Sequence, residues 1–339
     1  MTPSRFNEIT SRYRKLSIGV VGDICLDRYL EIDPAKEERS IETDLAVHNV
    51  VNVRSSPGAA GTVINNLCAL GAGRIYPIGF RGDDAEGLEL QRALEKLPHV
   101  SLQHFHSTPL RRTFTYTKPL VLEPGKAPRE LNRLDFKNWS RTPASVEKNL
   151  AASIAAVASK VDGFVVLDQV DQAGTGVVTT GVLKAIMAAQ ARNPDLFILA
   201  DSRRGLRGFP PFVWKMNRAE LARHANRKMR FTPSDIKAAA TTLAKKNQRA
   251  AFVTLAEDGI VGASPAGAVD HASALPVRGE IDIVGAGDAV TANLFAASAA
   301  GATLREAMEL AMCAASIVIH KLGTTGTASI AEMKRLLRK

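Results

Sequence analysis

The chain has 339 residues, of which 45% are hydrophobic and 23% charged, and its formal net charge at pH 7 is +10. These proportions are ordinary for a globular protein, and no window approaches the roughly 18 to 20 uninterrupted apolar residues that a membrane-spanning helix needs. The basic residues are scattered and no aromatic residues are interleaved with them, which does not favour a nucleic-acid surface. We expect neither a membrane nor a nucleic-acid partner.

The N-terminal segment and the cysteines indicate an intracellular protein. Residues 1–15 lack the apolar stretch of a secretory signal, so we expect a cytoplasmic location. Cys25, Cys68 and Cys313 lie far apart among apolar neighbours, and none belongs to a Cys-x-x-Cys or Cys/His ligand pattern. We expect three reduced thiols in the core.

Short apolar runs alternate with helix-like stretches through most of the chain. Each run has about four to six residues and is followed by polar residues or glycine, which is typical of buried parallel strands. The alternation predicts an α/β fold, a doubly wound and mostly parallel sheet with helices on both faces. The expected strands are 18–21, 163–167, 196–200 and 251–255, and the expected helices are 144–160, 179–192 and 234–246.

Two segments break this alternation. Residues 29–56 and 111–135 contain β-branched or aromatic residues that alternate with polar ones, as in Thr-Phe-Thr-Tyr-Thr at 113–117. They predict half-exposed antiparallel strands in a small sheet that projects from the main body. Such a sheet would serve as a lid over a site, as a dimer surface, or as both. We expect a single domain, residues 1–339, with this lid inserted in it.

The stretch Asp-Ile-Val-Gly-Ala-Gly-Asp at 282–288 carries the most chemical information. Small residues immediately before a helix let backbone N–H groups converge on an anion, and the helix dipole favours negative charge there. Asp288 would lie in the first turn, where a carboxylate can accept the proton of an attacking hydroxyl. The alternative is that Asp288 only caps the helix. The chain has no Walker A lysine pattern, and residues 174–176 lack the spacing of a dinucleotide fingerprint.

Four further motifs precede this stretch along the chain. In chain order they are Val-Val-Gly-Asp at 20–23 with Leu-Asp-Arg-Tyr at 26–29, Pro-Gly-Ala-Ala at 57–60 through Leu-Gly at 70–71, Arg-Leu-Asp at 133–135, and Asn-Arg-Ala-Glu at 217–220. Together with 282–288, and over residues 18–329, they resemble the PfkB or ribokinase-like family of carbohydrate kinases, with the heptose-phosphate kinase branch the most similar. The resemblance implies a ribokinase-like fold, ATP and Mg²⁺ as cofactors, and a sugar or sugar phosphate as acceptor.

The resemblance also implies roles for individual residues. Asp288 would be the base, and Gly285, Ala286 and Gly287 would form the anion hole. Asn217 and Glu220 would act on Mg²⁺ through water, although a helix cap with its i+3 partner is the other interpretation. The implied sugar-binding residues are Asp23, Asp27, Gly58, Ala59, Thr62 and Asn66, and the implied nucleotide-binding residues are Asn217, Glu220, Thr254, Glu257, Gly259 and Lys321, the last within the family-like segment 321–324.

The departures from the family pattern concern the substrate and the ions. Ala59 and Thr62 replace the usual glycine and asparagine of the sugar loop, so the sugar pocket is altered. Ile283 replaces a threonine near the loop where family members often hold a monovalent cation, which leaves K⁺ as an optional cofactor. Arg203 stands where the heptose kinases have lysine, and it keeps the positive charge that a phosphate would meet.

We therefore expect an ATP-dependent sugar kinase, with a heptose 7-phosphate phosphorylated at O1 as the acceptor that overall similarity favours. Other sugars, sugar phosphates and nucleosides stay open. The competing hypothesis is a non-catalytic sugar or nucleotide sensor that keeps the kinase fold. A homodimer formed through the lid is the expected assembly.

Overall fold

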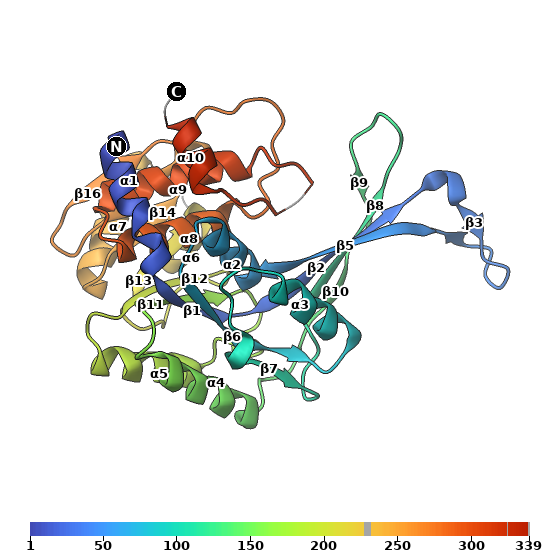
Figure 1. Cartoon of the computed structure of the whole chain (residues 1–339), viewed down its shortest axis with the longest axis horizontal. Coiled ribbons are helices and arrows are strands. Elements are labelled where there is room, and N and C mark those ends of the chain that lie inside the picture. The colour runs from blue at the N-terminus through green and yellow to red at the C-terminus, as the bar shows by residue number, and fades with distance from the viewer. Residues whose placement is uncertain (227–231, 324, 338–339) are drawn as a thin grey trace.

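The computed structural model describes residues 1–226, 232–323 and 325–337 and contains a nine-stranded sheet between two layers of helices (Figure 1). The strand order is β16–β15–β14–β13–β12–β11–β1–β6–β7. All neighbouring pairs from β14 to β7 are parallel, whereas the pairs β14–β15 and β15–β16 are antiparallel. The strands are β1 (Ser17–Gly22), β6 (Arg74–Gly82), β7 (Phe105–Thr108), β11 (Gly163–Asp168), β12 (Phe197–Ser202), β13 (Val213–Asn217), β14 (Ala251–Thr254), β15 (Ile260–Ala263) and β16 (Val269–Ala272).

The helices cover both faces of this sheet. Helices α1 (Pro3–Ser11), α2 (Ala60–Ala69), α3 (Ala85–Glu95), α8 (Ala286–Ala299), α9 (Leu304–Val318) and α10 (Ile330–Leu336) contribute to the core on one face. Helices α4 (Ala144–Val157), α5 (Thr180–Arg192), α6 (Arg218–His224) and α7 (Pro233–Asn247) contribute to the core on the other. Short 3₁₀ turns are η1 (Tyr13–Lys15), η2 (Pro34–Lys36), η3 (Leu102–His104) and η4 (Ala256–Asp258).

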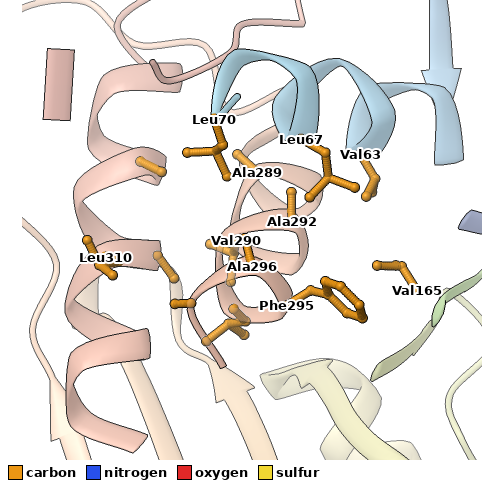
Figure 2. Packing of buried hydrophobic residues seen from close by; sticks show 14 of the residues in the cluster. Val63, Leu67, Leu70, Val165, Ala289, Val290, Ala292, Phe295, Ala296 and Leu310 are labelled. Carbon is orange, nitrogen blue, oxygen red and sulfur yellow. The ribbon is translucent and has the colours of Figure 1, made fainter. Parts of the chain in front are cut away.

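Alternation along the strands divides the interior into two cores. In β11, Val165 belongs to the core beneath α2 and α8, and its neighbour Val166 belongs to the opposite core. Figure 2 shows the first core, where side chains of α2 such as Leu67 face those of α8 such as Phe295. The small residues Ala289 and Ala292 let α2 and α8 approach each other closely. The core thereby fixes the position of the N-terminus of α8.

A second sheet projects from the body (Figure 1). Its order is β10–β8–β2–β5, with β9 paired to β8. The pairs β2–β5 and β8–β10 are antiparallel, but the central pair β2–β8 is parallel, so the expectation of an antiparallel sheet was wrong at its centre. The strands are β2 (Ile24–Ile32), β5 (Val50–Ala59), β8 (Thr115–Val121), β9 (Arg129–Glu130) and β10 (Leu134–Phe136), and a hairpin of β3 (Glu38–Arg39) and β4 (Ala46–Val47) extends from it.

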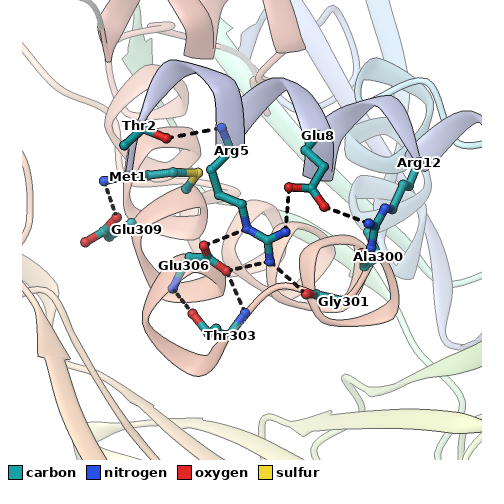
Figure 3. A network of polar contacts seen from close by, with 10 residues as sticks. All are labelled: Met1, Thr2, Arg5, Glu8, Arg12, Ala300, Gly301, Thr303, Glu306 and Glu309. Carbon is teal, nitrogen blue, oxygen red and sulfur yellow. Dashed lines mark hydrogen bonds and ion pairs between the residues drawn. The ribbon is translucent and has the colours of Figure 1, made fainter.

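The N-terminal helix is fastened to the body by ion pairs (Figure 3). The Arg5 guanidinium donates to both carboxylate oxygens of Glu306 at 2.8 and 3.1 Å and to the Gly301 carbonyl at 3.1 Å. The α-amino group of Met1 lies 3.0 Å from the Glu309 carboxylate. These contacts join α1 to α9 and to the turn that precedes it.

The order of the strands reverses beside β1. From β1 the chain proceeds outward through β6 to β7, and it later returns through β11 to β14 on the other side. In open α/β sheets, ligands bind at such a switch point, outside the carboxyl ends of the strands. The lid begins there, because β2 follows β1 after Asp23 alone.

The expected α/β fold, with its mostly parallel sheet and projecting small sheet, is confirmed. Each predicted strand and helix of the body occurs, with boundaries shifted by a few residues, as in α7, which begins at Pro233. All three cysteines are free, but Cys68 is only half-buried. Thr324, the last residue of the family-like segment at 321–324, lies outside the described residues. In the described residues, no helix is long and apolar enough to cross a membrane.

Candidate active site

The N-terminus of α8, residues 285–288, lies at the carboxyl edge of the sheet, and we call this first turn the cradle. Its N-cap Gly285 has φ 81°, a left-handed conformation that glycine adopts without the cost of a side chain. The amides of Gly287 and Asp288 have no acceptor in the part of the chain that is described, as expected in a first helical turn. The amide of Ala286, which was expected to face an anion, instead donates to the Ile283 carbonyl at 3.2 Å.

Asp288 lies in the first turn of α8 and is half-buried. Burial raises its pKa to about 7, and the neighbouring carboxylates of Asp201 and Asp27 act in the same direction. The ammonium of Lys215 opposes this shift. A carboxyl group with this pKa is close to the balance point at which it can both accept and release a proton near neutral pH.

Lys215 is a site residue that the sequence analysis missed. It lies on β13, is buried, and donates from Nζ to Asp201 Oδ2 at 2.8 Å. Burial alone would lower the pKa of Lys215, but the carboxylates of Asp201 and Glu220 raise it, so the ammonium stays charged. A Cβ placed on Gly287 would lie 3.5 Å from Nζ, so the charge is next to the free amides of α8. A lysine inside the otherwise apolar run 213–216 was the signal available.

Asp201 connects the strands of the body to α8. It is buried at the carboxyl end of β12, and its Oδ2 lies 2.9 Å from the hydroxyl of Thr291 on α8. The same hydroxyl lies 3.0 Å from the Gly287 carbonyl. Asp201, Lys215 and Thr291 thus fix the distance between β12, β13 and the start of α8.

Asn217 and Glu220 form a reciprocal capping box at the start of α6. Asn217 Oδ1 accepts from the Glu220 amide at 2.9 Å, and Glu220 Oε2 accepts from the Asn217 amide at 2.7 Å. Burial and the charge of Asp201 raise the pKa of Glu220. Thr254, at the end of β14, is in register with Asn217. In the described residues no group of three His, Cys, Asp or Glu side chains could hold a metal ion.

Asp27 lies on the inner face of the lid, close enough to Asp288 for its charge to act on that carboxyl group. Asp27 is buried on β2, and burial raises its pKa against the opposing charges of Lys118 and Arg133. Gly58 lies beside it on β5, where an added Cβ would come within 2.6 Å of Asp27 Oδ2. Any side chain at Gly58 would therefore displace this carboxylate.

Asp23 is placed at the switch point, but its carboxylate already has partners. Its oxygens accept from the amides of Gln169 at 2.9 Å and Val177 at 2.7 Å. Burial raises the pKa of Asp23 to about 7, and the neighbouring charge of Asp168 adds to the shift. Asp23 thus holds the segment that follows β11 against the root of the lid.

The altered sugar loop forms the start of α2. Ala59, its N-cap, has φ 53° and ψ −118°, a conformation that glycine adopts far more easily. The Thr62 methyl lies 3.5 Å from a Cβ placed on Gly285, so α2 contacts the cradle. Asn66 is fully buried and donates to the Thr62 carbonyl at 2.9 Å, which directs its amide along the helix.

The remaining nucleotide-binding predictions fall at three different places. Glu257 is exposed in η4. Gly259 has φ 93°, and an added Cβ would lie 2.1 Å from the Ala272 carbonyl oxygen, so the turn requires glycine. The ammonium of Lys321 donates to the Thr327 carbonyl at 2.6 Å and pairs with Glu332 at 2.8 Å, which anchors the loop beside the cradle.

Three kinds of comparison place the chain among known proteins. The profile described as pfkB family carbohydrate kinase matches residues 17–331. Two curated relatives are named bifunctional protein HldE: the protein of Bradyrhizobium sp. is 29% identical over 97% of this chain, and that of Pelobacter propionicus is 30% identical over 97%. The chain spans 65% and 64% of their lengths.

Solved structures share the fold. Phosphofructokinase-2 from Escherichia coli, in complex with substrates and products, superposes with a TM-score of 0.71 at 18% identity and covers 95% of this chain and 98% of its own. Arabidopsis thaliana ribokinase, complexed with ribose and ATP, gives a TM-score of 0.67 at 17% identity and covers 96% and 99%. At these identities the likeness concerns the fold alone.

Proposed function

Because the chain belongs to the pfkB family of carbohydrate kinases, we propose that it transfers the γ-phosphoryl group of ATP to a hydroxyl of a sugar or sugar phosphate, with Asp288 as the base. The observation that carries the proposal is the constellation at the start of α8. There, free amides, the Lys215 ammonium and an Asp288 carboxyl with a pKa of about 7 lie together at the carboxyl edge of the sheet.

Each residue of this constellation has a separate role in phosphoryl transfer. Asp288 accepts the proton of the acceptor hydroxyl as the new O–P bond forms and the bond to the ADP leaving group breaks. The Gly287 amide and the Lys215 ammonium stabilise negative charge on the transferring group. Asp201 holds Lys215 in place, so this charge needs no reorganisation during the reaction.

The charges of the site also fit Mg²⁺ with ATP. Three carboxyl groups, those of Asp201, Glu220 and Asp288, act electrostatically on the Lys215 ammonium, so a further cation would be favoured there. Mg²⁺ in kinases keeps several waters and uses one or two carboxylates with substrate phosphates. Glu220 would hold the ion through water, and the ion would neutralise charge on the ATP phosphates.

We place the acceptor between the cradle and the inner face of the lid, beside Asp27 and Gly58. The likeness of the motifs to the heptose-phosphate kinase branch of the family favours a heptose 7-phosphate as the acceptor. K⁺ is an optional addition, since the side chain of Ile283 is exposed and apolar and only backbone oxygens would hold the ion. A cytoplasmic location and a homodimer through the lid complete the proposal.

The test is ATP consumption with Mg²⁺ across sugars, sugar phosphates and nucleosides, in K⁺ and in Na⁺ buffers. Turnover with one acceptor class by the wild type, and its loss by about 10³-fold in Asp288→Asn, is the expected result. Asp195→Asn, an exposed change in the turn before β12, is the matched control and keeps full turnover. Saturable binding of a sugar phosphate with no turnover would instead favour a sensor that keeps the kinase fold.

A further inference from the structure

The inner face of the lid is organised in rows of paired residues. Residues that pair across neighbouring strands share a face, so Asp27 of β2 lies in one row with Ser56 of β5 and Tyr116 of β8. Two residues further along the strands, and on the same face, the next row begins at Tyr29. This second row is roughly 6.5 Å farther from the body of the molecule.

The second row contains an aromatic ring between two cations. Arg54 of β5 and Lys118 of β8 both pair with Tyr29 in the strand register. The Arg54 guanidinium carbon and the Lys118 ammonium each lie 4.9 Å from the centre of the Tyr29 ring. Two positive charges therefore flank the Tyr29 ring, one from each neighbouring strand, on the face that is turned toward Asp288.

Lys118 is the unusual member of this row. Its exposed fraction is 9%, and within the described part of the chain its ammonium has one hydrogen-bond partner, the Tyr29 hydroxyl at 3.4 Å. No carboxylate lies within 4.0 Å of its ammonium in residues 1–226, 232–323 and 325–337. A buried ammonium costs several kcal/mol unless an anion pairs with it, so this position favours a negatively charged ligand.

Arg54 differs in that it already has partners. Its guanidinium pairs with Glu31 on the neighbouring strand and donates to the Gly323 carbonyl at 3.4 Å. Gly323 belongs to the loop that Lys321 anchors next to the cradle. Arg54 thus connects the lid with the loop next to the cradle, and it presents a half-exposed charge across the Tyr29 ring from Lys118.

Negative charges border this row, and the charge of Lys118 acts to lower the pKa of Asp27, but in the described residues neither Asp27 nor Glu31 is within ion-pair distance of Lys118. Asp27 lies one row nearer the body, and Glu31 one row nearer the tip. On β10, the Asp135 carboxylate is occupied by Arg133, whose guanidinium lies 3.0 Å from it.

We propose that Lys118, assisted by Arg54, binds a phosphate group at the end of the acceptor that is remote from the hydroxyl facing Asp288. The inference rests on the proposed function and adds to it a specificity site. The Lys118 row lies roughly 6.5 Å beyond the Asp27 row, so we place the phosphate there, at the far end of a six- or seven-carbon acceptor whose reacting hydroxyl faces Asp288. The phosphate supplies an ion-pair partner for Lys118, and an unphosphorylated sugar does not.

The test separates the acceptor's phosphate from those of ATP. KM and kcat are measured for fructose 6-phosphate, sedoheptulose 7-phosphate and heptose 7-phosphate, and for the corresponding free sugars, in wild type and Lys118→Met. The expected result is a 10- to 100-fold rise in KM for the phosphorylated acceptor, the range of a lost charged hydrogen bond. The KM for ATP and the KM for free sugars stay within about twofold, and Lys118→Arg restores most of the affinity.

Lys126→Met is the matched control, because Lys126 is an exposed lid lysine paired with Glu123. It leaves all KM values unchanged. A rise in KM for ATP, an equal rise for free and phosphorylated sugars, or no change in Lys118→Met would each overturn the proposal. If Lys118→Met fails to fold, as judged by circular dichroism, Arg54→Gln is measured in its place and a smaller rise in the same KM is expected.

A binding measurement keeps the subsite testable if no acceptor is turned over. Calorimetric titration with the same three sugar phosphates, without ATP, should show binding by the wild type and by Asp288→Asn but not by Lys118→Met. That pattern without turnover would refute the kinase reaction and retain the phosphate subsite. Equal binding by the wild type and Lys118→Met, or no binding of any sugar phosphate by the wild type, would refute the subsite.

Discussion

Lys215 and Asp201 show how single residues define this site. Both are charged residues within or at the end of buried strands, where an unpaired charge is costly, and each compensates the other at 2.8 Å. The motif at 282–288 indicated an anion cradle from sequence, because small residues before a helix have a local meaning. Lys215 carries no comparable local signal, because its neighbours in space come from β12 and α8. Only the order of strands in the sheet brings these residues together.

Asp288 gives a prediction that joins activity with stability. In the reaction proposed above, Asp288 acts as the base and must be ionised, so kcat/KM of the wild type should fall about tenfold per pH unit below about 7, the pKa of Asp288. Because this pKa lies above the unfolded value, the folded state binds the proton more tightly. The stability contributed by Asp288 is fully present at low pH and is lost as pH rises toward 7.

Asp288→Asn cannot ionise and should therefore raise the melting temperature at pH 8 by a few degrees while abolishing turnover. Scanning calorimetry at pH 8 and pH 5 provides the measurement, with a smaller difference expected at pH 5. A melting temperature below that of the wild type at pH 8 would show that Asp288 is stabilised in its charged form, contrary to this account.

Ala59 gives a second prediction at a single residue. Its φ of 53° is unfavourable for any residue with a Cβ, by roughly 1 to 2 kcal/mol. Glycine relieves this cost but gains entropy in the unfolded chain, so Ala59→Gly should stabilise the fold by about 1 kcal/mol. Urea unfolding measures the change. Ala60→Gly, in the first turn of α2, is the matched control and should destabilise, and a destabilising Ala59→Gly would contradict the backbone argument.

At the scale of the elements, prediction from sequence succeeded where a strand was uniformly apolar. The predicted runs became β1, β11, β12 and β14, since continuous apolar residues are buried on both faces of a parallel sheet. β6 was not predicted because Pro77 interrupts it, and proline normally argues against a central strand. β13 was not predicted because of Lys215. The parallel pairing of β2 with β8 depends on contacts between distant segments and has no local signal.

The attachment of α1 gives a prediction for one element. Arg5 lowers the pKa of Glu306 to about 2, so this carboxylate contributes stability above its unfolded pKa of 4.5 and loses it as pH falls toward 2. Glu306→Gln should cost about 1 kcal/mol at pH 7, since both the ion pair and the cap at Thr303 weaken. Urea unfolding at pH 7 and pH 3 measures the cost, which should shrink at pH 3. Glu257→Gln, an exposed change at a residue for which the described part of the chain offers no ion pair, should cost nothing, and an equal loss in both variants would contradict the role of α1.

At the scale of the whole molecule, the lid has two chemically different faces. The inner face carries Asp27, Tyr29 and their charged neighbours. On the opposite face, Val53 pairs with Leu30, and Leu134 pairs with Thr117, so both point away from the site. Their exposed fractions are 44% and 60%. The edge strand β5 adds unpaired backbone groups, and an exposed apolar edge favours association with another chain.

We therefore expect the wild type to sediment as a dimer at micromolar concentration, with the outer faces of two lids in contact. Val53→Lys combined with Leu134→Lys places four charges in the contact between the two chains. The double variant should be monomeric, because the free-energy cost of burying unpaired ammonium groups exceeds the gain from burying apolar surface. Met187→Lys, an equally exposed change on α5, should leave the dimer intact. Sedimentation velocity distinguishes the two variants. A monomeric wild type would contradict this prediction and would mean that the apolar face binds a different partner. A dimer that survives the double substitution would show that the interface lies elsewhere on the molecule.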